Sequence, residues 1–263
     1  MSELNRRTFL KSVGGTGVAL SVAGCSELTG SGGGGENTIV PGTASGFPPF
    51  EFVNESGELV GFDVDLLSAV VEQTDYTLGE WEDLEFGQLI TALDNDRIDV
   101  IAAAMTINDD RDQAIDFTDP YYDANQAILV RDDGEFSPGS LDDLSGHKVG
   151  AQKGTTGENV VKEQLIEADK LKQSNYKAYD NYTLAVTDLE NGNVDAVVLD
   201  TPVADSFQGE RDVTTAFTYE TGEKYGFGVR EDDDDLREAL NEGLATVMED
   251  GTYEDLTKKW FQE

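Results

Sequence analysis

The sequence has 263 residues, of which 54 are acidic and 18 are basic, and its formal net charge at pH 7 is -36. A surface this anionic excludes nucleic acid and anionic lipid as partners. A single cysteine, Cys25, and a single histidine, His147, exclude a disulfide framework and a metal site built from cysteine or histidine clusters. Carboxylates occur in every segment, which favours a protein that folds in molar salt; the alternative is an ordinary acidic extracytoplasmic protein.

The first 25 residues have the features of an export signal. The pair Arg6-Arg7 precedes a weakly apolar, glycine-rich run from residue 13 to residue 23. This run is too short to span a bilayer, which takes about 20 apolar residues, and with the paired arginines it resembles a twin-arginine signal. The segment "VAGC" at 22–25 resembles a lipobox. We therefore expect a signal at 1–25, lipidation of Cys25, a flexible tether at 26–37, and attachment to the outer face of the cell membrane.

From residue 38 onward, strand and helix patterns alternate, which is typical of an α/β protein. The segment 108–116 is predicted to be a helix because Asn108 is a good N-cap. The first half contains predicted strands at 37–42, 98–105 and 126–130, and predicted helices at 61–75, 86–97 and 108–116.

The second half repeats this order of elements. Thr155 and Glu158 have the spacing of a capping box, Gly192 closes a helix, and Pro202 stands near the start of another. The second half contains predicted strands at 147–152, 194–200 and 224–229, and predicted helices at 155–170, 181–192, 201–207, 234–251 and 252–263.

Two halves with similar element order predict two lobes. In open α/β sheets, ligands bind beyond the carboxyl ends of the strands. Two buried strands end in polar residues, at Met105-Thr106 and at Leu199-Asp200, and Arg111 follows the first of them. If these ends face each other across a cleft, a cation from one lobe and an anion from the other meet there. That arrangement is suited to a zwitterionic ligand, although Arg111 could instead pair with neighbouring aspartates at the surface.

Several stretches, in this order, resemble the family 3 solute-binding proteins, the polar amino-acid-binding proteins of ABC transporters. They include "GFPPFEF", "GELVGFDVDLLSAV", "IDVIAAAMTINDDR", "IDFTDPYYDANQAILV", "GNVDAVVLDTPVA" and "DGTYEDLTKKWF". The resemblance implies a monomer without cofactor or metal, and a two-lobed α/β type II periplasmic-binding-protein fold. It places lobe 1 at 38–122 and 225–263, lobe 2 at 126–218, and hinge strands at 123–125 and 219–224.

The resemblance also implies the ligand contacts. Arg111 resembles the arginine that holds the ligand α-carboxylate, and Asp200 resembles the acceptor of the α-ammonium. Thr106 is implied to contact the carboxylate through its hydroxyl and backbone. The remaining implied contacts are the backbone of Ala104, Thr155 and Thr156 at a helix start, Phe47 and Phe86 around the ligand side chain with Phe50 behind them, and Gln152 and Lys153 along the pocket.

One position departs from the family pattern. Ala44 stands in "GTASGFPPF" where many relatives carry an aspartate that helps to bind a polar or cationic side chain. The departure weakens a claim for lysine, arginine or glutamine as the ligand.

The resemblance favours capture of an amino acid and its delivery to an ABC permease and ATPase. One alternative is a sensory module that reports to a separate receptor. Another is an enzyme of the same fold, such as a cyclohexadienyl-dehydratase-like enzyme or a murein-cleaving domain, which needs an acid or base in the cleft. The lone His147 cannot complete a Ser/His/Asp set, so a binding protein is the expectation and an enzyme is not.

Overall fold

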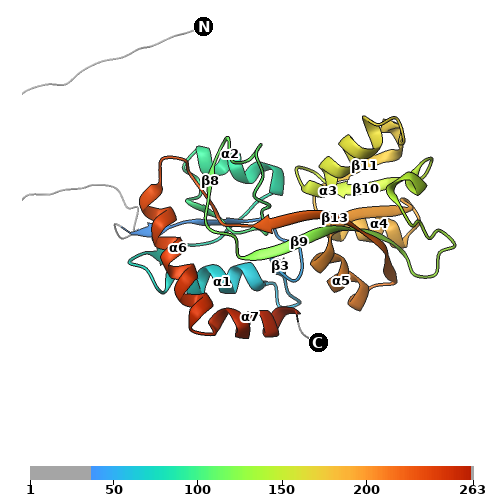
Figure 1. The fold of residues 1–263 in the computed structure, drawn as a ribbon. Helices are drawn as coiled ribbons and strands as arrows, with labels where there is room; N and C mark the ends of the chain where they lie inside the picture. Colours follow the sequence, from blue (N-terminus) through green and yellow to red (C-terminus); the bar gives the residue numbers. More distant parts are fainter. Residues whose placement is uncertain (1–36, 262–263) are drawn as a thin grey trace, which may run out of the picture. The chain divides into compact units, whose positions relative to one another are not determined.

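The computed structural model describes residues 37–261; the predicted signal with Cys25, and residues 26–36 of the predicted tether, lie outside this part of the chain. Within it, two five-stranded sheets, each accompanied by helices, make a two-lobed α/β fold (Figure 1). None of the helices between residues 37 and 261 has the length and hydropathy that a membrane span requires.

The first lobe is built on a mixed sheet. Strand β2 is parallel to both β6 and β7, whereas β14, from near the end of the chain, is antiparallel to β7 and β8. In spatial order this sheet contains β6 (Glu82–Asp83), β2 (Pro41–Thr43), β7 (Val100–Ile101), β14 (Gly228–Val229) and β8 (Asp116–Phe117). Two short pairs come from the same part of the chain: β1 (Thr38–Ile39) with β5 (Thr77–Leu78), and β3 (Phe52–Val53) with β4 (Leu59–Val60).

Helix α1 carries the apolar face around which this lobe packs. Leu66, Leu67 and Val70 are fully buried, at the spacing that places them on one side of a helix. The last two helices of the chain pack against α1, and a side chain at Gly243 would approach the backbone oxygen of Val70 to 2.5 Å (Figure 1). The helices of the lobe are α1 (Phe62–Val71), the single 3-10 turn η1 (Phe86–Gln88), α2 (Leu89–Asp94), α6 (Asp234–Glu249) and α7 (Thr252–Phe261).

The second lobe has its own sheet, whose strands are buried on both faces near its centre. Strands β11, β10 and β12 are parallel, and β9 is antiparallel to β12. In spatial order the strands are β11 (Tyr176–Tyr179), β10 (Val149–Gln152), β12 (Ala196–Asp200), β9 (Tyr122–Arg131) and β13 (Val213–Tyr225). The helices are η2 (Leu141–Leu144), α3 (Thr156–Asn159), η3 (Val160–Ile166), η4 (Gln173–Asn175), α4 (Tyr182–Glu190) and α5 (Thr201–Glu210).

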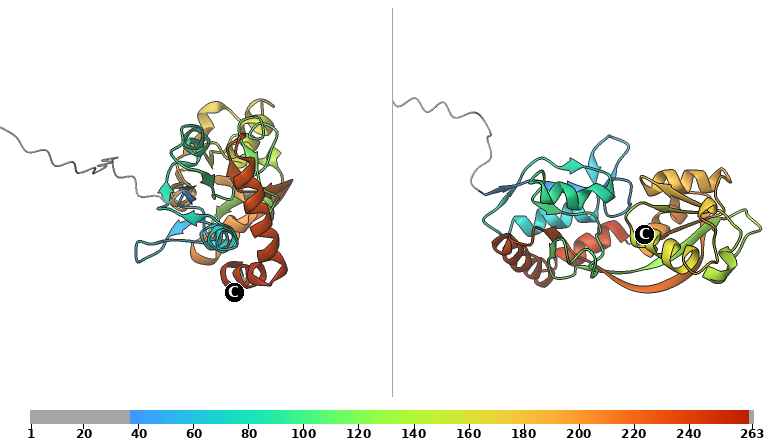
Figure 2. Two further views of the ribbon diagram at one scale, coloured as in Figure 1. Left: turned by 90° about the vertical axis from the view of Figure 1, so that its left-hand side faces the viewer. Right: turned by 90° about the horizontal axis from the view of Figure 1, so that it is seen from above.

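Two long antiparallel strands, β9 and β13, run from one lobe into the other, as Figures 1 and 2 show in green and orange. Each belongs to the second sheet along most of its length, but β9 begins shortly after β8 and β13 ends shortly before β14. The residues predicted to be hinges, 123–125 and 219–224, lie on these strands. That the lobes open about them stays a prediction.

The prediction of a helix at 108–116 is wrong. The N–H of Asp112 bonds to the oxygen of Asn108 at 2.9 Å, and the N–H of Ile115 bonds to the oxygen of Arg111 at 3.0 Å, which makes a turn. The chain then enters the sheet as β8, which pairs with β14. Tertiary pairing of Asp116–Phe117 therefore ends the helical pattern before it can propagate.

Other predicted elements exist but differ in extent. The strand predicted at 98–105 is paired only over β7, and the buried chain beyond it is irregular, with Ala104 at a positive φ of 44°. The helix predicted at 155–170 is a short α-helix continued by the π-helix η3, and it ends at residue 166. The strand predicted at 224–229 is split between the end of β13 and β14.

Candidate ligand-binding site

A small cavity of about 10 Å³ lies between side chains from both lobes. It brings together nine of the ten residues that the sequence predicts as ligand contacts: Phe47, Phe86, Ala104, Thr106, Arg111, Gln152, Thr155, Thr156 and Asp200; Ala44 and Glu51 complete its lining. The tenth, Lys153, is not brought to the cavity. It lies in the turn that follows β10, and its half-exposed ammonium pairs with Asp180 at 2.5 Å.

Arg111 is buried, although the turn that carries it is at the surface. Its Nη1 donates to the backbone oxygen of Thr106 at 2.6 Å, and its Nη2 donates across the lobes to the oxygen of Gly154 at 3.0 Å. The guanidinium also lies 5.2 Å from the ring centre of Phe86, within cation–π range. Burial lowers the pKa of Arg111, but a guanidinium stays charged in proteins. The side chain is therefore a fixed cation in the cavity wall.

Asp200 ends β12 and is the anion on the opposite lobe. The Tyr225 hydroxyl donates to its Oδ2 at 2.7 Å, and the Gln126 amide donates to its Oδ1. Burial, followed by the charge of Glu223, raises the pKa of Asp200 to about 8, against the two hydrogen bonds and Arg111, which lower it. A cation placed beside Asp200 would favour its ionised form.

The start of α3 supplies the second lobe's hydroxyl groups. Thr155 caps the helix, because its Oγ1 accepts the N–H of Glu158 at 3.2 Å. The reciprocal bond of the predicted capping box goes one residue earlier, since the Glu158 carboxylate accepts the N–H of Gly154 at 2.8 Å. The Thr156 hydroxyl donates to that of Thr106 at 3.1 Å, which joins the two lobes beside Arg111.

Aromatic side chains form one side of the cavity. The ring of Phe47 lies 5.9 Å from that of Phe50 and 5.7 Å from that of Tyr182, while Phe86 lines the cavity from η1 and is half-buried. Phe50 is fully buried behind Phe47. Tyr182 was not predicted from the sequence; its hydroxyl lies 3.0 Å from Thr155 Oγ1.

Glu51 is the cavity residue that the sequence did not suggest. It is fully buried, and neither carboxylate oxygen has a hydrogen-bond partner among the described residues. Burial, with the charges of Asp63 and Asp200, raises the pKa of Glu51 well above its ordinary range. An uncompensated buried carboxylate is costly, so Glu51 is the group of this site most in need of a partner. The sequence feature that could have indicated burial of Glu51 is its place between two aromatic residues in "PPFEF".

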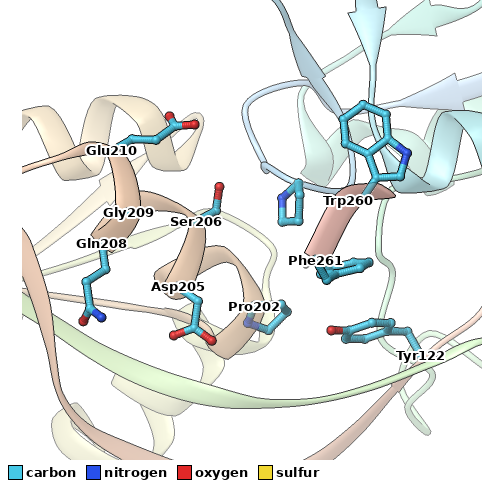
Figure 3. Close-up of a pocket in the computed structure, with 10 residues that line it drawn as sticks. Tyr122, Pro202, Asp205, Ser206, Gln208, Gly209, Glu210, Trp260 and Phe261 are labelled. Carbon is cyan, nitrogen blue, oxygen red and sulfur yellow. The ribbon is translucent and has the colours of Figure 1, made fainter. Parts of the chain in front are cut away.

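A separate, wider groove lies between α5 and the C-terminal end of α7 (Figure 3). The carboxylates of Asp205 and Glu210 face it from α5, and Tyr122, Trp260 and Phe261 supply aromatic surface. None of the predicted contact residues lines it, and its described lining contains no basic side chain. The groove therefore lacks the paired opposite charges of the cavity.

The cavity can be compared with those of known proteins through similarity of sequence and structure. Residues 39–263 match the family model described as bacterial extracellular solute-binding proteins, family 3. The "Putative ABC transporter arginine-binding protein 2" of Escherichia coli (strain K12) is 35% identical over 232 residues, which cover 86% of this chain and 91% of the relative.

Solved structures agree with this assignment. The chain resembles "An ancestral arginine-binding protein bound to arginine", with 39% identity, a TM-score of 0.79, and coverage of 86% of this chain and 98% of that one. A second structure, "An ancestral arginine-binding protein bound to glutamine", also gives a TM-score of 0.79. It is 39% identical, with coverage of 88% of this chain and 100% of that one.

A third similar structure is the ancestral amino acid-binding protein AncCDT-1, a precursor of cyclohexadienyl dehydratase. It is 33% identical, with a TM-score of 0.78 and coverage of 86% of this chain and 96% of that one. These relatives are binding proteins, and their fold is the type II periplasmic-binding-protein fold. The chain belongs to the family 3 extracellular solute-binding proteins.

Proposed function

We propose that this protein captures an amino acid between its two lobes and delivers it to an ABC permease. The observation that carries the proposal is the presence of Arg111 and Asp200 in the wall of one cavity, both buried and on opposite lobes. Two opposite charges match the carboxylate and the ammonium of an α-amino acid, and charge-assisted hydrogen bonds are the strong ones. The ABC-transporter relative named above supports the delivery step.

The two ends of the ligand would be held differently. Arg111 offers a planar fork that binds a carboxylate through two parallel hydrogen bonds, which lysine cannot reproduce. Asp200 accepts from the ammonium, and its position at the end of β12 fixes its direction. Because the contacts come from both lobes, a ligand that satisfies both stabilises the closed arrangement in proportion to its differential affinity.

We further propose that the ligand has a cationic side chain, with arginine as the leading candidate. Glu51 lines the same cavity as Ala44 and supplies the carboxylate that the departure at Ala44 removes. A guanidinium or ammonium beside Glu51 would provide the missing partner of both oxygens. Phe47 and Phe86 would cover the apolar stem of such a side chain. The relative that is named as arginine-binding supports this choice.

We propose binding without catalysis. One candidate acid or base in the cavity, Glu51, is proposed above to pair with a ligand cation; the other is Asp200, which already accepts hydrogen bonds from Tyr225 and Gln126. A ligand ammonium would complete its coordination and leave it no proton to transfer. The similar AncCDT-1 is itself described as an amino acid-binding protein.

We also propose that the protein acts outside the cell membrane, held there by lipid on Cys25. The support is the sequence pattern at 1–25 together with the extracellular character of the family. Two acyl chains would be needed, because one chain gives only marginal attachment.

Arg111→Ala is expected to weaken binding of L-arginine by at least about 100-fold, or about 2.8 kcal/mol, because the ligand carboxylate loses its charged partner. Isothermal titration calorimetry measures the dissociation constant. Arg97→Ala is the matched control, since Arg97 is exposed and pairs with Glu82 at the surface. Binding by Arg111→Ala within threefold of the unmodified protein would refute this role.

Glu51→Gln is expected to weaken binding of L-arginine by about tenfold or more while changing binding of L-glutamine by less than about threefold. A neutral amide keeps the shape of Glu51 and removes its charge. The same calorimetry with both ligands measures the change, and Glu55→Gln, at an exposed position of the same loop, is the control. Equal losses for the two ligands, or no loss for either, would contradict a cation-binding role.

The same substitution is expected to raise the thermal stability of the ligand-free protein at pH 8. The folded-state pKa of Glu51 is raised, so its carboxyl destabilises the fold increasingly as the pH rises above its ordinary pKa toward the folded-state value. Glutamine cannot ionise, so the variant does not lose folding stability in this way as the pH rises. A melting temperature at pH 8 below that of the unmodified protein would contradict burial of an unpaired carboxylate.

Cys25→Ser is expected to move the protein from the membrane fraction to the soluble fraction of the producing cells, because the residue can no longer carry a thioether-linked lipid. Fractionation followed by quantitative immunoblotting measures the distribution, with Ser26→Ala as the neighbouring control. A variant that stays with the membrane as fully as the control would rule out anchoring through Cys25.

A further inference from the structure

Glu223 follows an irregularity in the pairing of the two connecting strands. The register of β13 against β9 shifts between Tyr219 and Glu223, so that residues 220–222 bulge out opposite Asn125. The Asn125 Oδ1 accepts two backbone N–H groups of the bulge, at 2.9 and 2.8 Å. A bulge redirects the side chains next to it. Here the redirected side chain is a carboxylate that is buried, although the neighbouring Glu220 is exposed.

The Glu223 carboxylate accepts three side-chain hydrogen bonds. The donors are the hydroxyl of Thr106 at 2.7 Å, the amide of Gln126 at 2.8 Å and the hydroxyl of Thr221 at 2.7 Å. Glu223 does not line the ligand cavity, but one of its donors, Thr106, does. Its hydrogen bonds therefore reach the site through other side chains.

The bond to Glu223 decides what the Thr106 hydroxyl can offer to a ligand. A hydroxyl has one proton and two lone pairs, and Thr106 donates its proton to Glu223. It therefore presents only acceptor lone pairs to the cavity; the donation from Thr156 at 3.1 Å uses one of them and leaves the other. An acceptor suits the α-ammonium of a ligand, so the hydroxyl does not suit the α-carboxylate contact that the family resemblance implies.

The second link leads from Glu223 to Asp200. The same Gln126 amide nitrogen donates to both carboxylates, and so it holds the Asp200 side chain at a fixed place beside Glu223. Tyr225 reinforces this arrangement, because its backbone pairs with Thr106 while its hydroxyl donates to Asp200 at 2.7 Å. Both acceptors for the ligand ammonium, Thr106 and Asp200, are thereby oriented by one network centred on Glu223.

We propose that Glu223 is a positioning residue of the ligand site. It fixes the Thr106 hydroxyl as an acceptor and, through Gln126, aligns Asp200 with it, so that the two together receive the ligand ammonium. This inference rests on the proposed amino-acid binding. The strand β13, which connects the lobes, would then also have a role in ligand recognition.

A double-mutant cycle tests the proposal. The full chain, Glu223→Gln, Thr106→Val and the double variant are titrated with L-arginine and L-glutamine, with Glu220→Gln as the exposed control. Each single substitution is expected to weaken binding of either ligand by about tenfold or more, because both ligands share the same ammonium. The double variant is expected to lose less than the product of the two single losses, because part of the effect of Glu223 passes through Thr106.

The outcomes distinguish failure of the proposed function from failure of the inference about Glu223. Failure of the unmodified protein to bind either ligand, or any other amino acid, would overturn the proposed function and this inference with it. If the unmodified protein binds, two results would overturn the inference alone. One is an affinity of Glu223→Gln within twofold of the unmodified protein, and the other is a double variant in which the two single losses multiply.

A lowered melting temperature with unchanged affinity would also overturn the inference, because it would mean that Glu223 only stabilises the bulge. If Glu223→Gln does not fold, Glu223→Asp replaces it. Its shorter side chain cannot reach Thr106 and Gln126 together, so full affinity in that variant contradicts the proposal and a loss supports it.

Discussion

The region between the two lobes contains several buried ionisable side chains, and burying a charge costs folding free energy unless the charge has a partner. Arg111, Asp200, Glu51 and Glu223 are all buried there, and each would be destabilising without a compensating partner. Glu223 and Asp200 have hydrogen-bond donors from the surrounding strands, and Arg111 donates to two backbone oxygens. Within residues 37–261, the Glu51 carboxylate has no hydrogen-bond partner. This region contains three carboxyl groups and one guanidinium. If all three carboxyls ionise, they leave an excess of negative charge that a cationic ligand would offset.

The fold makes this concentration of charge possible by bringing distant segments together. The turn after β7 places Arg111, the end of β12 places Asp200, and the start of α3 places two hydroxyl groups, all beyond the ends of strands. The strands β9 and β13 supply Gln126 and Glu223 from the connection between the lobes. The same elements that would move in opening therefore carry the network that orients the ammonium acceptors, which would couple recognition to closure.

Much of this could be predicted from the sequence, and the failures have physical causes. Thr106 and Asp200 each follow a run of apolar residues, so their place at the edge of a cleft could be predicted. The segment at 108–116 has a good N-cap but becomes a turn, because its last residues pair with β14, which lies more than a hundred residues later. Local propensity does not include that pairing.

The site residues that were missed share a different cause. Glu51 alternates with phenylalanines and Glu223 sits among polar residues, so each resembles one of the many surface carboxylates of this acidic chain. Glu51 is buried where its backbone pairs with that of Phe47, and Glu223 is buried next to the bulge at 220–222. Lys153 differs in the opposite direction, because it follows the cavity residue Gln152 in the sequence but lies in an exposed turn and pairs with Asp180.

The most direct test of the central claim is calorimetric titration with L-arginine and with two analogues that each lack one end of the zwitterion. Agmatine lacks the carboxylate, and argininic acid carries a hydroxyl group in place of the ammonium. If Arg111 and Asp200 hold the two ends, L-arginine binds and each analogue binds at least about 100-fold more weakly. Binding of either analogue as tightly as L-arginine would contradict the account, because the corresponding buried charge would then have no part in recognition.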